Sequence, residues 1–306
     1  MCAYRMCVSD VRIGEEHARH DRQMSSRPSP TVRPFLKWAG NKYRILAQIK
    51  AALPPGRRLI EPFVGSGAVF ANTDYARYLL ADVNPDLIAV YRHLQEEGPR
   101  FIEHCRSYFT ARNNTGAAYY DLRARFNQTA DVREKAALFV YLNRHCYNGL
   151  CRYNAGGGFN VPFGRYRKPY FPAAEMAHFH ERARRAEFVC AAFGETMAGA
   201  QPGDAVYCDP PYAPLSATAN FTSYSVQPFG VDEQRALARL AEKLAGGGVT
   251  VIISNHDTEF TRREYAQARI VAFDVLRTIS CDGSRRGAVG ELLAIFDGDG
   301  APRPAR

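Results

Sequence analysis

The sequence lacks the features that would place the protein in a membrane, outside the cell or around a metal ion. It has no continuous run of about 18 apolar residues, so we expect no transmembrane helix. Its first residues carry no apolar stretch of the secretory type, so we expect no signal peptide. The cysteines form no Cys-x-x-Cys pair and the histidines show no metal-binding spacing, so we expect no metal site. These absences favour a reduced, intracellular protein.

The remaining composition is that of a globular protein with a basic excess. At 306 residues, 46% of them hydrophobic, the chain can form one large domain or two modest ones. Its net charge of +9 fits a polyanionic partner, although a need for solubility would explain the charge equally well. Cys190 and Cys208 fall in apolar, strand-like runs, where we expect buried thiols. Residues 1–30 and 299–306 are predicted to be disordered tails.

Short apolar runs alternate with amphipathic segments over most of the chain, which predicts a doubly wound α/β fold. The predicted strands are residues 58–63, 78–82, 187–191, 205–208 and 249–254, with a terminal pair at 269–276 and 291–296. Residues 85–172 show helical periodicity but no strand rhythm. We therefore expect a core formed by residues 31–84 and 173–298, interrupted by a largely helical insertion at 85–172.

The stretch from Asp204 to Tyr212 carries the most specific chemical signal. Asp209 follows a predicted buried strand, at the sheet edge where open α/β folds bind ligands. Pro210 and Pro211 stiffen the turn, because each fixes its own φ and restricts the residue before it. The Asp209 carboxylate and the Pro210 carbonyl can each accept one N–H of an exocyclic amino group, while Tyr212 can stack on a flat heterocycle. A strand that merely stops at two prolines has the same pattern, so this interpretation depends on its context.

The ends of the first two predicted strands indicate a nucleoside cofactor. Glu61 lies near the end of the first predicted strand, which is followed by a glycine-rich turn at residues 64–67. Asp82 ends the second strand 21 positions later (82 − 61), where an acid can accept both ribose hydroxyls. The turn lacks the full dinucleotide fingerprint, and no Lys or Arg follows Gly67, so a nucleoside without phosphates fits best. Glu61, Asp82 and Asp209 would meet at one edge and favour a cation such as a sulfonium.

The only tryptophan, Trp38, lies in a turn before a predicted helix at residues 43–53. One interpretation makes Trp38 the aromatic wall of a pocket, with Lys37 and Lys42 as cations beside it. The other is a capped helix start with a core tryptophan, and the residues alone favour that one.

Two loop segments of the insertion, residues 143–154 and 160–170, interleave arginine, asparagine and tyrosine. Arg can bond bidentately to guanine, Asn to adenine, and Tyr can wedge between bases, so we favour a nucleic-acid surface. The alternative is an aromatic loop packed on helices with solvated arginines. A polar segment at 213–230 is long enough to close over a bound base, and a basic turn at 281–287 could contact phosphate.

Seven stretches of the chain, in one order, resemble DNA adenine methylases of the Dam type. They cover roughly residues 34–296 and read FLKWAGNK, LIEPFVGSG, LADVN, YLNRHCYNGLCRYN, FNVPFGRY, YCDPPYAPLSATANF and ISNHDT. The resemblance implies a Rossmann-like, S-adenosylmethionine-dependent methyltransferase core with a DNA-recognition insertion. It further implies methylation of adenine N6 within GATC in duplex DNA, by base flipping and direct transfer. Two places differ from the family pattern: Asn41 replaces a second glycine, and Ala155–Gly158 replaces a more polar stretch.

The family's functional residues map onto matching positions of this chain. Asp209, Pro210 and Tyr212 would act on the adenine. Asp209 would also bind the cofactor together with Trp38, Lys42, Glu61 and Asp82, with Phe63, Gly65 and Gly67 around its methionine part. The residues expected to contact DNA are Lys37, Tyr147, Asn148, Leu150, Arg152, Pro162 and Tyr166.

Three other functions remain open at this point. Related four-residue motifs serve RNA and protein amide methyltransferases on the same core. A DNA-binding protein without catalysis is opposed by the intact Asp209 and Asp82, and a nicotinamide dehydrogenase would leave the acceptor turn unexplained. The resemblance also implies a monomeric bacterial protein in the cytoplasm, associated with the nucleoid through DNA. The biological role, in genome maintenance or beside a restriction enzyme, does not follow from the sequence.

Overall fold

The computed structural model describes residues 31–213, 229–276 and 288–298, and the described residues from Val32 onward form one compact unit. The expected tails and the basic turn at 281–287 lie outside the described residues, as does most of the polar segment at 213–230.

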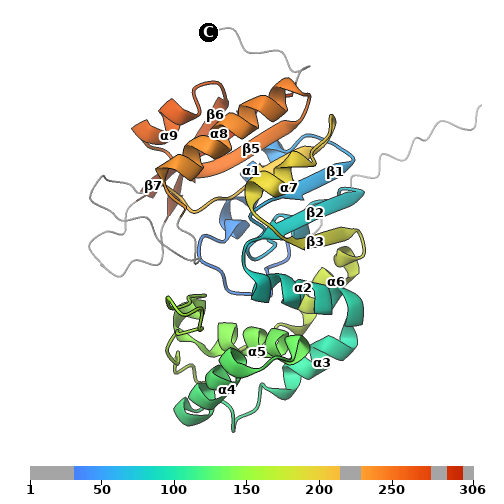
Figure 1. Cartoon of the computed structure of the whole chain (residues 1–306), viewed down its shortest axis with the longest axis vertical. Helices are drawn as coiled ribbons and strands as arrows, with labels where there is room; N and C mark the ends of the chain where they lie inside the picture. Colours follow the sequence, from blue (N-terminus) through green and yellow to red (C-terminus); the bar gives the residue numbers. More distant parts are fainter. Residues whose placement is uncertain (1–30, 214–228, 277–287, 299–306) are drawn as a thin grey trace, which may run out of the picture. The chain divides into compact units, whose positions relative to one another are not determined.

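A seven-stranded sheet with the order β3-β2-β1-β4-β5-β7-β6 forms the centre of the fold (Figure 1). Its strands are β1 (Arg58–Glu61), β2 (Arg77–Asp82), β3 (Ala186–Cys190), β4 (Ala205–Cys208), β5 (Thr250–His256), β6 (Arg269–Leu276) and β7 (Ala288–Phe296). The first five strands run parallel, whereas β7 lies between β5 and β6 and is antiparallel to both. The prediction of a doubly wound α/β fold with a terminal strand pair is confirmed.

Helices cover both faces of the sheet. Successive strand residues point to opposite faces, so Leu59 and Ile60 of β1 enter two separate apolar clusters. The first cluster includes residues of α1 (Leu46–Ala52), α2 (Pro85–Glu97) and α6 (Ala173–Ala183). The second includes residues of α7 (Phe193–Ala198) and α8 (Val231–Gly246), and Tyr265, which follows α9 (Glu259–Glu264). The parallel strands are therefore buried on both sides, which explains their nearly continuous apolar sequence.

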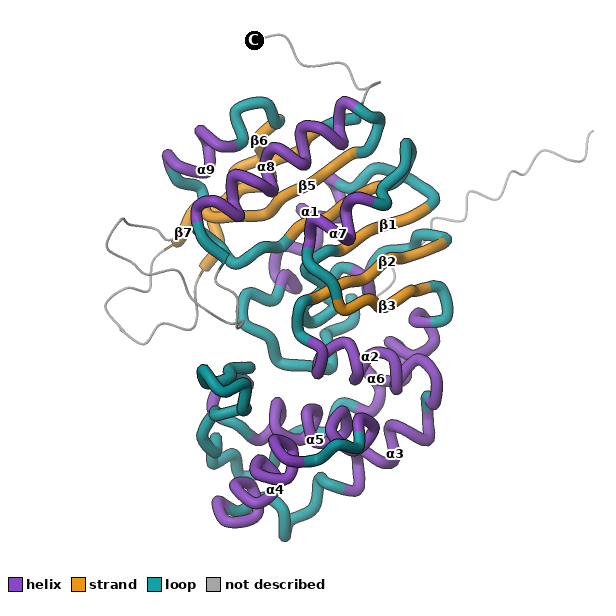
Figure 2. The backbone as a smooth tube through the Cα atoms, viewed as in Figure 1, coloured by secondary structure: helices purple, strands orange, loops and turns teal. Residues whose placement is uncertain are grey.

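The segment between β2 and α6 begins with four helices, α2, α3 (Pro99–Ser107), α4 (Gly116–Gln128) and α5 (Val132–His145), and continues after α5 as a mainly irregular stretch (Figure 2). Asn84 and Asp131 start α2 and α5 by accepting backbone N–H bonds, and Pro85 occupies a first-turn position that needs no N–H. Nearly all of α5 from Ala136 onward is buried. The apolar cluster of the insertion is continuous with one face of the sheet, because α2 contacts both α5 and β3.

Three expectations about local environment are wrong or shifted. Cys208 is buried as expected, but Cys190 is exposed, because β3 is an edge strand and ends there. The strand predicted at residues 249–254 ends later than expected, because β5 continues through His256 by pairing with β7. His145 likewise ends a helix instead of lying in a loop, and it is buried.

Candidate functional site

Three carboxylates lie where neighbouring parallel strands end. Glu61 ends β1, Asp82 ends β2, and Asp209 directly follows β4. β1 pairs with both β2 and β4, so the three strand ends share one edge of the sheet. Asp209 is close enough to Glu61 that its charge disfavours ionisation of Glu61. The structure therefore brings the three predicted acids together.

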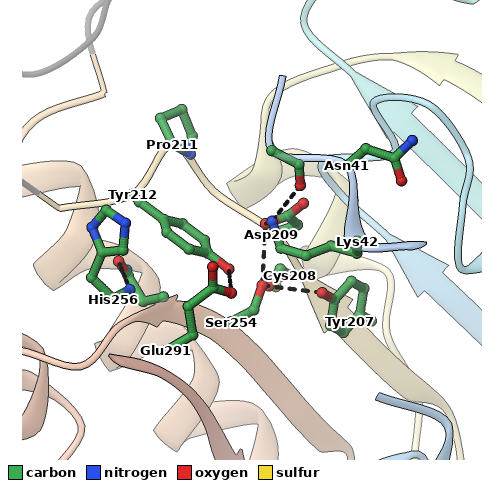
Figure 3. A network of polar contacts seen from close by, with 12 residues as sticks. Asn41, Lys42, Tyr207, Cys208, Asp209, Pro211, Tyr212, Ser254, His256 and Glu291 are labelled. Atoms are coloured by element: carbon green, nitrogen blue, oxygen red, sulfur yellow. Dashed lines mark hydrogen bonds and ion pairs between the residues drawn. The ribbon is translucent and has the colours of Figure 1, made fainter. Parts of the chain in front are cut away.

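Asp209 is held by a cation and a hydroxyl (Figure 3). The Lys42 ammonium lies 2.7 Å from its Oδ1, and Ser254 Oγ donates to the same oxygen over 3.1 Å. Burial raises the pKa of Asp209 above its ordinary value, and the charge and hydrogen bond of Lys42 oppose that shift. Lys42 thus opposes the effect of burial on this partly buried acceptor carboxylate.

Buried amides fix the turn that carries Asp209. The Gln234 amide on α8 donates to the Pro211 carbonyl over 2.7 Å, and Asn255 Oδ1 accepts the Ala213 N–H over 3.0 Å. Asn255 Nδ2 donates in turn to Gln234 Oε1 over 3.1 Å, and both amides are fully buried. Within the described part of the chain, nothing bonds the Pro210 carbonyl, which leaves this predicted acceptor available.

The ring of Tyr212 is fixed by contacts on several sides. Its hydroxyl donates to Glu291 Oε2 over 3.2 Å, and the Lys42 ammonium lies 4.5 Å from its ring centroid. The His256 ring meets it edge to face at 4.7 Å. Burial is the main cause that raises the pKa of Tyr212 well above its usual range, so the ring acts as a neutral platform. No local pattern in the sequence singles out Glu291.

The glycine-rich turn closes around Asp82. The Gly65 N–H donates to Asp82 Oδ2 over 3.2 Å, and the Asn84 N–H donates to Oδ1 over 3.0 Å. Gly65 has φ +46, and a Cβ there would lie 2.8 Å from the indole nitrogen of Trp38. Trp38 is only half-buried, so it borders the turn instead of filling the core. Burial raises the pKa of Asp82 to about 6, although both backbone bonds favour its charge.

Glu61 is the least satisfied acid at this edge. It is 2% exposed, and its Oε1 has no hydrogen-bond partner among the described residues. Burial first, and the Asp209 charge second, raise its pKa to about 8. The unpaired oxygen of Glu61 lies at the same sheet edge as Asp82, whose carboxylate can accept hydrogen bonds from hydroxyl groups. Such a pair fits a polar ligand such as a nucleoside.

An aromatic cluster that the sequence analysis missed adjoins Glu61. Phe63 stacks on Phe193 with ring centroids 5.7 Å apart, and Phe229 meets Phe63 edge to face at 5.5 Å. All three rings are half-buried. Phe193 and Phe229 begin or precede helices, and nothing in their local sequence distinguishes them from core residues. Flat apolar rings beside the acids fit the base of a nucleoside cofactor.

The expected DNA-contacting residues come together on a hairpin that follows α5. Isolated bridges join Cys146 to Phe163 and Tyr153 to Phe159, with the glycine run at its tip. Tyr147 N donates to the Pro162 carbonyl over 2.8 Å, and its ring is 53% exposed. We call residues 145–166 the recognition hairpin.

The recognition hairpin also orients two other predicted residues. The exposed Arg152 donates through Nε to Asn160 Oδ1 over 2.8 Å, which fixes its guanidinium. Asn148 adopts φ +54 and donates its N–H to the Tyr166 hydroxyl over 3.0 Å. Leu150 is half-buried against the apolar cluster, and Pro162 is exposed.

Lys37 reaches the recognition hairpin from the N-terminal loop. Its ammonium lies 4.0 Å from the centroid of the Tyr166 ring. Burial and the nearby Arg144 charge lower the pKa of Lys37. At the other end of the loop, Asn41 accepts the Tyr43 N–H over 2.9 Å and so caps η1 (Lys42–Ile45), a role that glycine could not fill.

Neither a metal site nor a membrane span was found in the described part of the chain. No group of three or more His, Cys, Asp or Glu side chains there is placed to hold an ion. None of the described helices is long and apolar enough to cross a membrane.

The fold and site define a doubly wound α/β protein with a candidate ligand site at the carboxyl edge of its sheet. A family model described as D12 class N6 adenine-specific DNA methyltransferase matches residues 38–279. The chain is 54% identical over 265 residues to the DNA adenine methylase of Vibrio cholerae, which covers 86% of this chain and 96% of that protein. It is 50% identical over 274 residues to the DNA adenine methylases of Escherichia coli and Salmonella typhi, covering 90% of this chain and 98% of each. The chain belongs to the D12 class of adenine-specific DNA methyltransferases.

Membership in this family settles the class of reaction. The protein is an enzyme that methylates N6 of adenine in DNA and needs a methyl donor. The resemblance to Dam-type methylases found in the sequence is thereby confirmed.

Proposed function

We propose that the protein transfers a methyl group from S-adenosylmethionine to adenine N6 within GATC in duplex DNA. The observation that carries the proposal is the geometry of Asp209, a carboxyl acceptor in a stiff turn, held by Lys42 and Ser254 beside the Tyr212 ring. Adenine N6 is a poor nucleophile because its lone pair is delocalised into the ring. Two acceptors that take its two N–H bonds favour a more tetrahedral nitrogen with a localised lone pair.

The turn supplies both acceptors from adjacent residues. The Asp209 carboxylate accepts one N–H, and the Pro210 carbonyl accepts the other. Tyr212 provides the stacking surface for the purine. Holding the amino group in line with its reaction partner is the main catalytic contribution, and no covalent enzyme intermediate is needed.

S-adenosylmethionine, when bound, supplies an electrophilic methyl group on a sulfonium. Asp82 accepts the ribose hydroxyls, Glu61 offers its orphaned oxygen, and the rings of Phe193 and Phe229 lie beside the base. Phe63, Gly65 and Gly67 line the methionine part, together with Trp38 and Lys42. The acidic edge favours a cationic ligand over a neutral one.

The recognition hairpin provides the DNA surface in this proposal. An adenine inside a duplex cannot reach a turn at the end of β4, so the base must be flipped out at a cost of a few kcal/mol. The exposed Tyr147 is placed to wedge into the stack that the base leaves. Arg152, oriented by Asn160, contacts guanine. Asn148, Leu150, Pro162 and Tyr166, together with Lys37, form the surrounding surface.

We further propose that residues 31–84 and 173–298 serve as the catalytic part and residues 85–172 as the recognition insertion. The enzyme would act as a monomer on the chromosome in the bacterial cytoplasm. The proposal rests on the bacterial sources of its relatives and on a single chain that contributes both the acceptor turn and the recognition hairpin.

The decisive experiment measures transfer of a tritiated methyl group from S-adenosylmethionine to short duplexes. We expect rapid labelling of a duplex with GATC and slow labelling of the same duplex with one base of the site changed. RNA and protein glutamine or asparagine substrates are assayed in parallel. Preferential labelling of either of them, or equal labelling of all duplexes, would reject the proposal.

A further inference from the structure

One buried amide joins the recognition hairpin to the loop that carries Lys42. Asn143 lies in the last turn of α5 and is 2% exposed. Its Oδ1 accepts the Lys37 N–H over 2.9 Å, and its Nδ2 donates to the Lys37 carbonyl over 2.7 Å. The same Nδ2 lies 3.4 Å from the Gly149 carbonyl in the recognition hairpin. The side chain therefore clasps the backbone of two segments that are distant in sequence.

The two clasped segments are packed without room to spare. A Cβ at Gly149 would lie 2.3 Å from Cβ of Lys37. Gly149 also has φ +65, which favours glycine. The Lys37 ammonium extends over the Tyr166 ring, and the Tyr166 hydroxyl accepts the Asn148 N–H. A shift of the hairpin therefore moves Lys37, and a shift of Lys37 moves the hairpin.

The same short loop ends at the acceptor carboxylate. The Asn41 N–H bonds back to the Trp38 carbonyl over 3.3 Å, and Lys42 Nζ donates to the Gly40 carbonyl over 2.5 Å. Lys42 then pairs with Asp209. Lys37, which packs against the hairpin, and Lys42, which pairs with Asp209, are only five positions apart (42 − 37). The loop is thus a short, tightly turned connection between the recognition hairpin and the acceptor carboxylate of Asp209.

We propose that Asn143 is a positioning residue that couples sequence recognition to the rate of methyl transfer. When the hairpin docks on the correct bases, Asn143 holds the loop so that Lys42 and Asp209 keep their catalytic geometry. On a wrong sequence, the displaced hairpin pulls the loop through the same amide. Asn143 touches neither DNA nor adenine, and its effect appears in the chemical step. This inference rests on the proposed function.

The test replaces Asn143 and a matched asparagine elsewhere. Asn143→Asp keeps the acceptor for the Lys37 N–H but loses the donor to both carbonyls. Asn72 makes the same two-point clasp on Val32, over 2.8 and 2.9 Å, and also donates to the Ala68 carbonyl, without reaching the hairpin. Asn72→Asp is therefore the control for a purely structural role.

Single-turnover methyl transfer at saturating DNA is measured on a GATC duplex and on single-base variants. We expect Asn143→Asp to slow transfer to GATC so that discrimination against the variants falls by about tenfold or more. Asn72→Asp should lower the melting temperature and keep discrimination. Gly149→Ala, which forces the hairpin and loop apart from the other side, should lose discrimination in the same way.

Two outcomes would overturn the inference. In the first, Asn143→Asp slows methyl transfer to all duplexes by the same factor. In the second, Asn72→Asp loses as much discrimination between duplexes as Asn143→Asp does. A wild-type enzyme that prefers a different adenine sequence would instead overturn the GATC proposal. The discrimination ratio of the variants would then be measured on the preferred sequence, so the two failures are distinguishable.

Discussion

Asp209 combines two opposed requirements in one side chain. It is partly shielded from water, which preserves its strength as an acceptor, yet that shielding disfavours its charge. Lys42 at 2.7 Å and Ser254 at 3.1 Å resolve the conflict by favouring the ionised form. The pair is best understood as a device that keeps the acceptor ready, more than as a stabilising contact, because a buried ion pair contributes little net stability.

Replacing Asp209 by alanine should remove catalysis and spare DNA binding. Asp209→Ala deletes one of the two N6 acceptors but none of the side chains on the recognition hairpin. We expect the single-turnover rate to fall by about 100-fold or more, while the affinity for a GATC duplex stays within about threefold. Rapid quench and fluorescence anisotropy measure the two quantities. A near-normal rate would show that Asp209 is not an acceptor for N6.

The raised pKa of Glu61 makes the folding free energy depend on pH. Glu61 titrates at about 8 when folded and near its ordinary value of about 4.5 when unfolded. Between these values the folded state binds more protons than the unfolded state, so stability falls as the pH rises through that window. Glu61→Gln replaces the titratable carboxyl by a neutral amide. As the pH rises from about 5 to about 9, we expect the free energy of unfolding of the variant to increase by several kcal/mol relative to that of the wild type.

Urea unfolding of both proteins across this pH range measures the difference. A constant offset between them would mean that Glu61 is already ionised in the folded protein. Glu187, an exposed acid on edge strand β3, provides the control, because Glu187→Gln should show no such trend.

At the scale of elements, the recognition hairpin depends on its bridges and on one orienting side chain. Arg152 is exposed, and its Nε bond to Asn160 limits the directions in which its guanidinium can point. A bidentate contact to guanine is worth about 1–3 kcal/mol of discrimination. Arg152→Ala should therefore slow methylation of GATC much more than methylation of a duplex already altered at the contacted guanine.

The measurement is kcat/KM on GATC and on its single-base variants. Arg239→Ala on α8 is the control, since it removes an exposed arginine of the same charge from an element outside the hairpin. If Arg152→Ala lowers kcat/KM equally on every duplex, Arg152 contacts the phosphate backbone instead of a base.

Helix α8 and strand β5 support the acceptor turn from beneath. Gln234 donates to the Pro211 carbonyl and accepts from Asn255 and Tyr265, all in the buried interior. Gln234→Ala leaves the Pro211 carbonyl without its partner and removes one acceptor from Asn255 and Tyr265, which still bond to each other. We expect a loss of about 2–3 kcal/mol in the free energy of unfolding, together with a lower rate of transfer. Urea unfolding tests the first expectation, and an unchanged midpoint would contradict the proposed support.

At the scale of the whole molecule, membership in a DNA methyltransferase family explains the net charge of +9, because the substrate is a polyanion. A protein that binds DNA through cations releases counterions, so the logarithm of its affinity should fall linearly with the logarithm of salt concentration. We expect this decline for duplexes with and without GATC, measured by anisotropy between about 50 and 200 mM salt. Affinity that does not change with salt would mean that the positive charge serves solubility alone.

The sequence by itself determined the order of the strands along the chain and the acids at their ends. These features are local: an apolar run predicts a buried strand, and a polar residue directly after it lies at the sheet edge. Glu61, Asp82 and Asp209 were therefore correctly predicted to share an edge. The helices of the insertion were also predictable, because amphipathic periodicity is a property of each segment's own sequence.

Only the tertiary structure decided which distant side chains meet. Asn143 clasps Lys37 across 106 positions, and nothing in the helical pattern of α5 marks it apart from a core residue. The aromatic cluster around Phe63 is likewise assembled from separate segments. Cys190 is exposed because sheet order, not its apolar neighbours, places β3 at the edge. Burial and pairing depend on how elements pack against one another, and that information is carried by the whole chain.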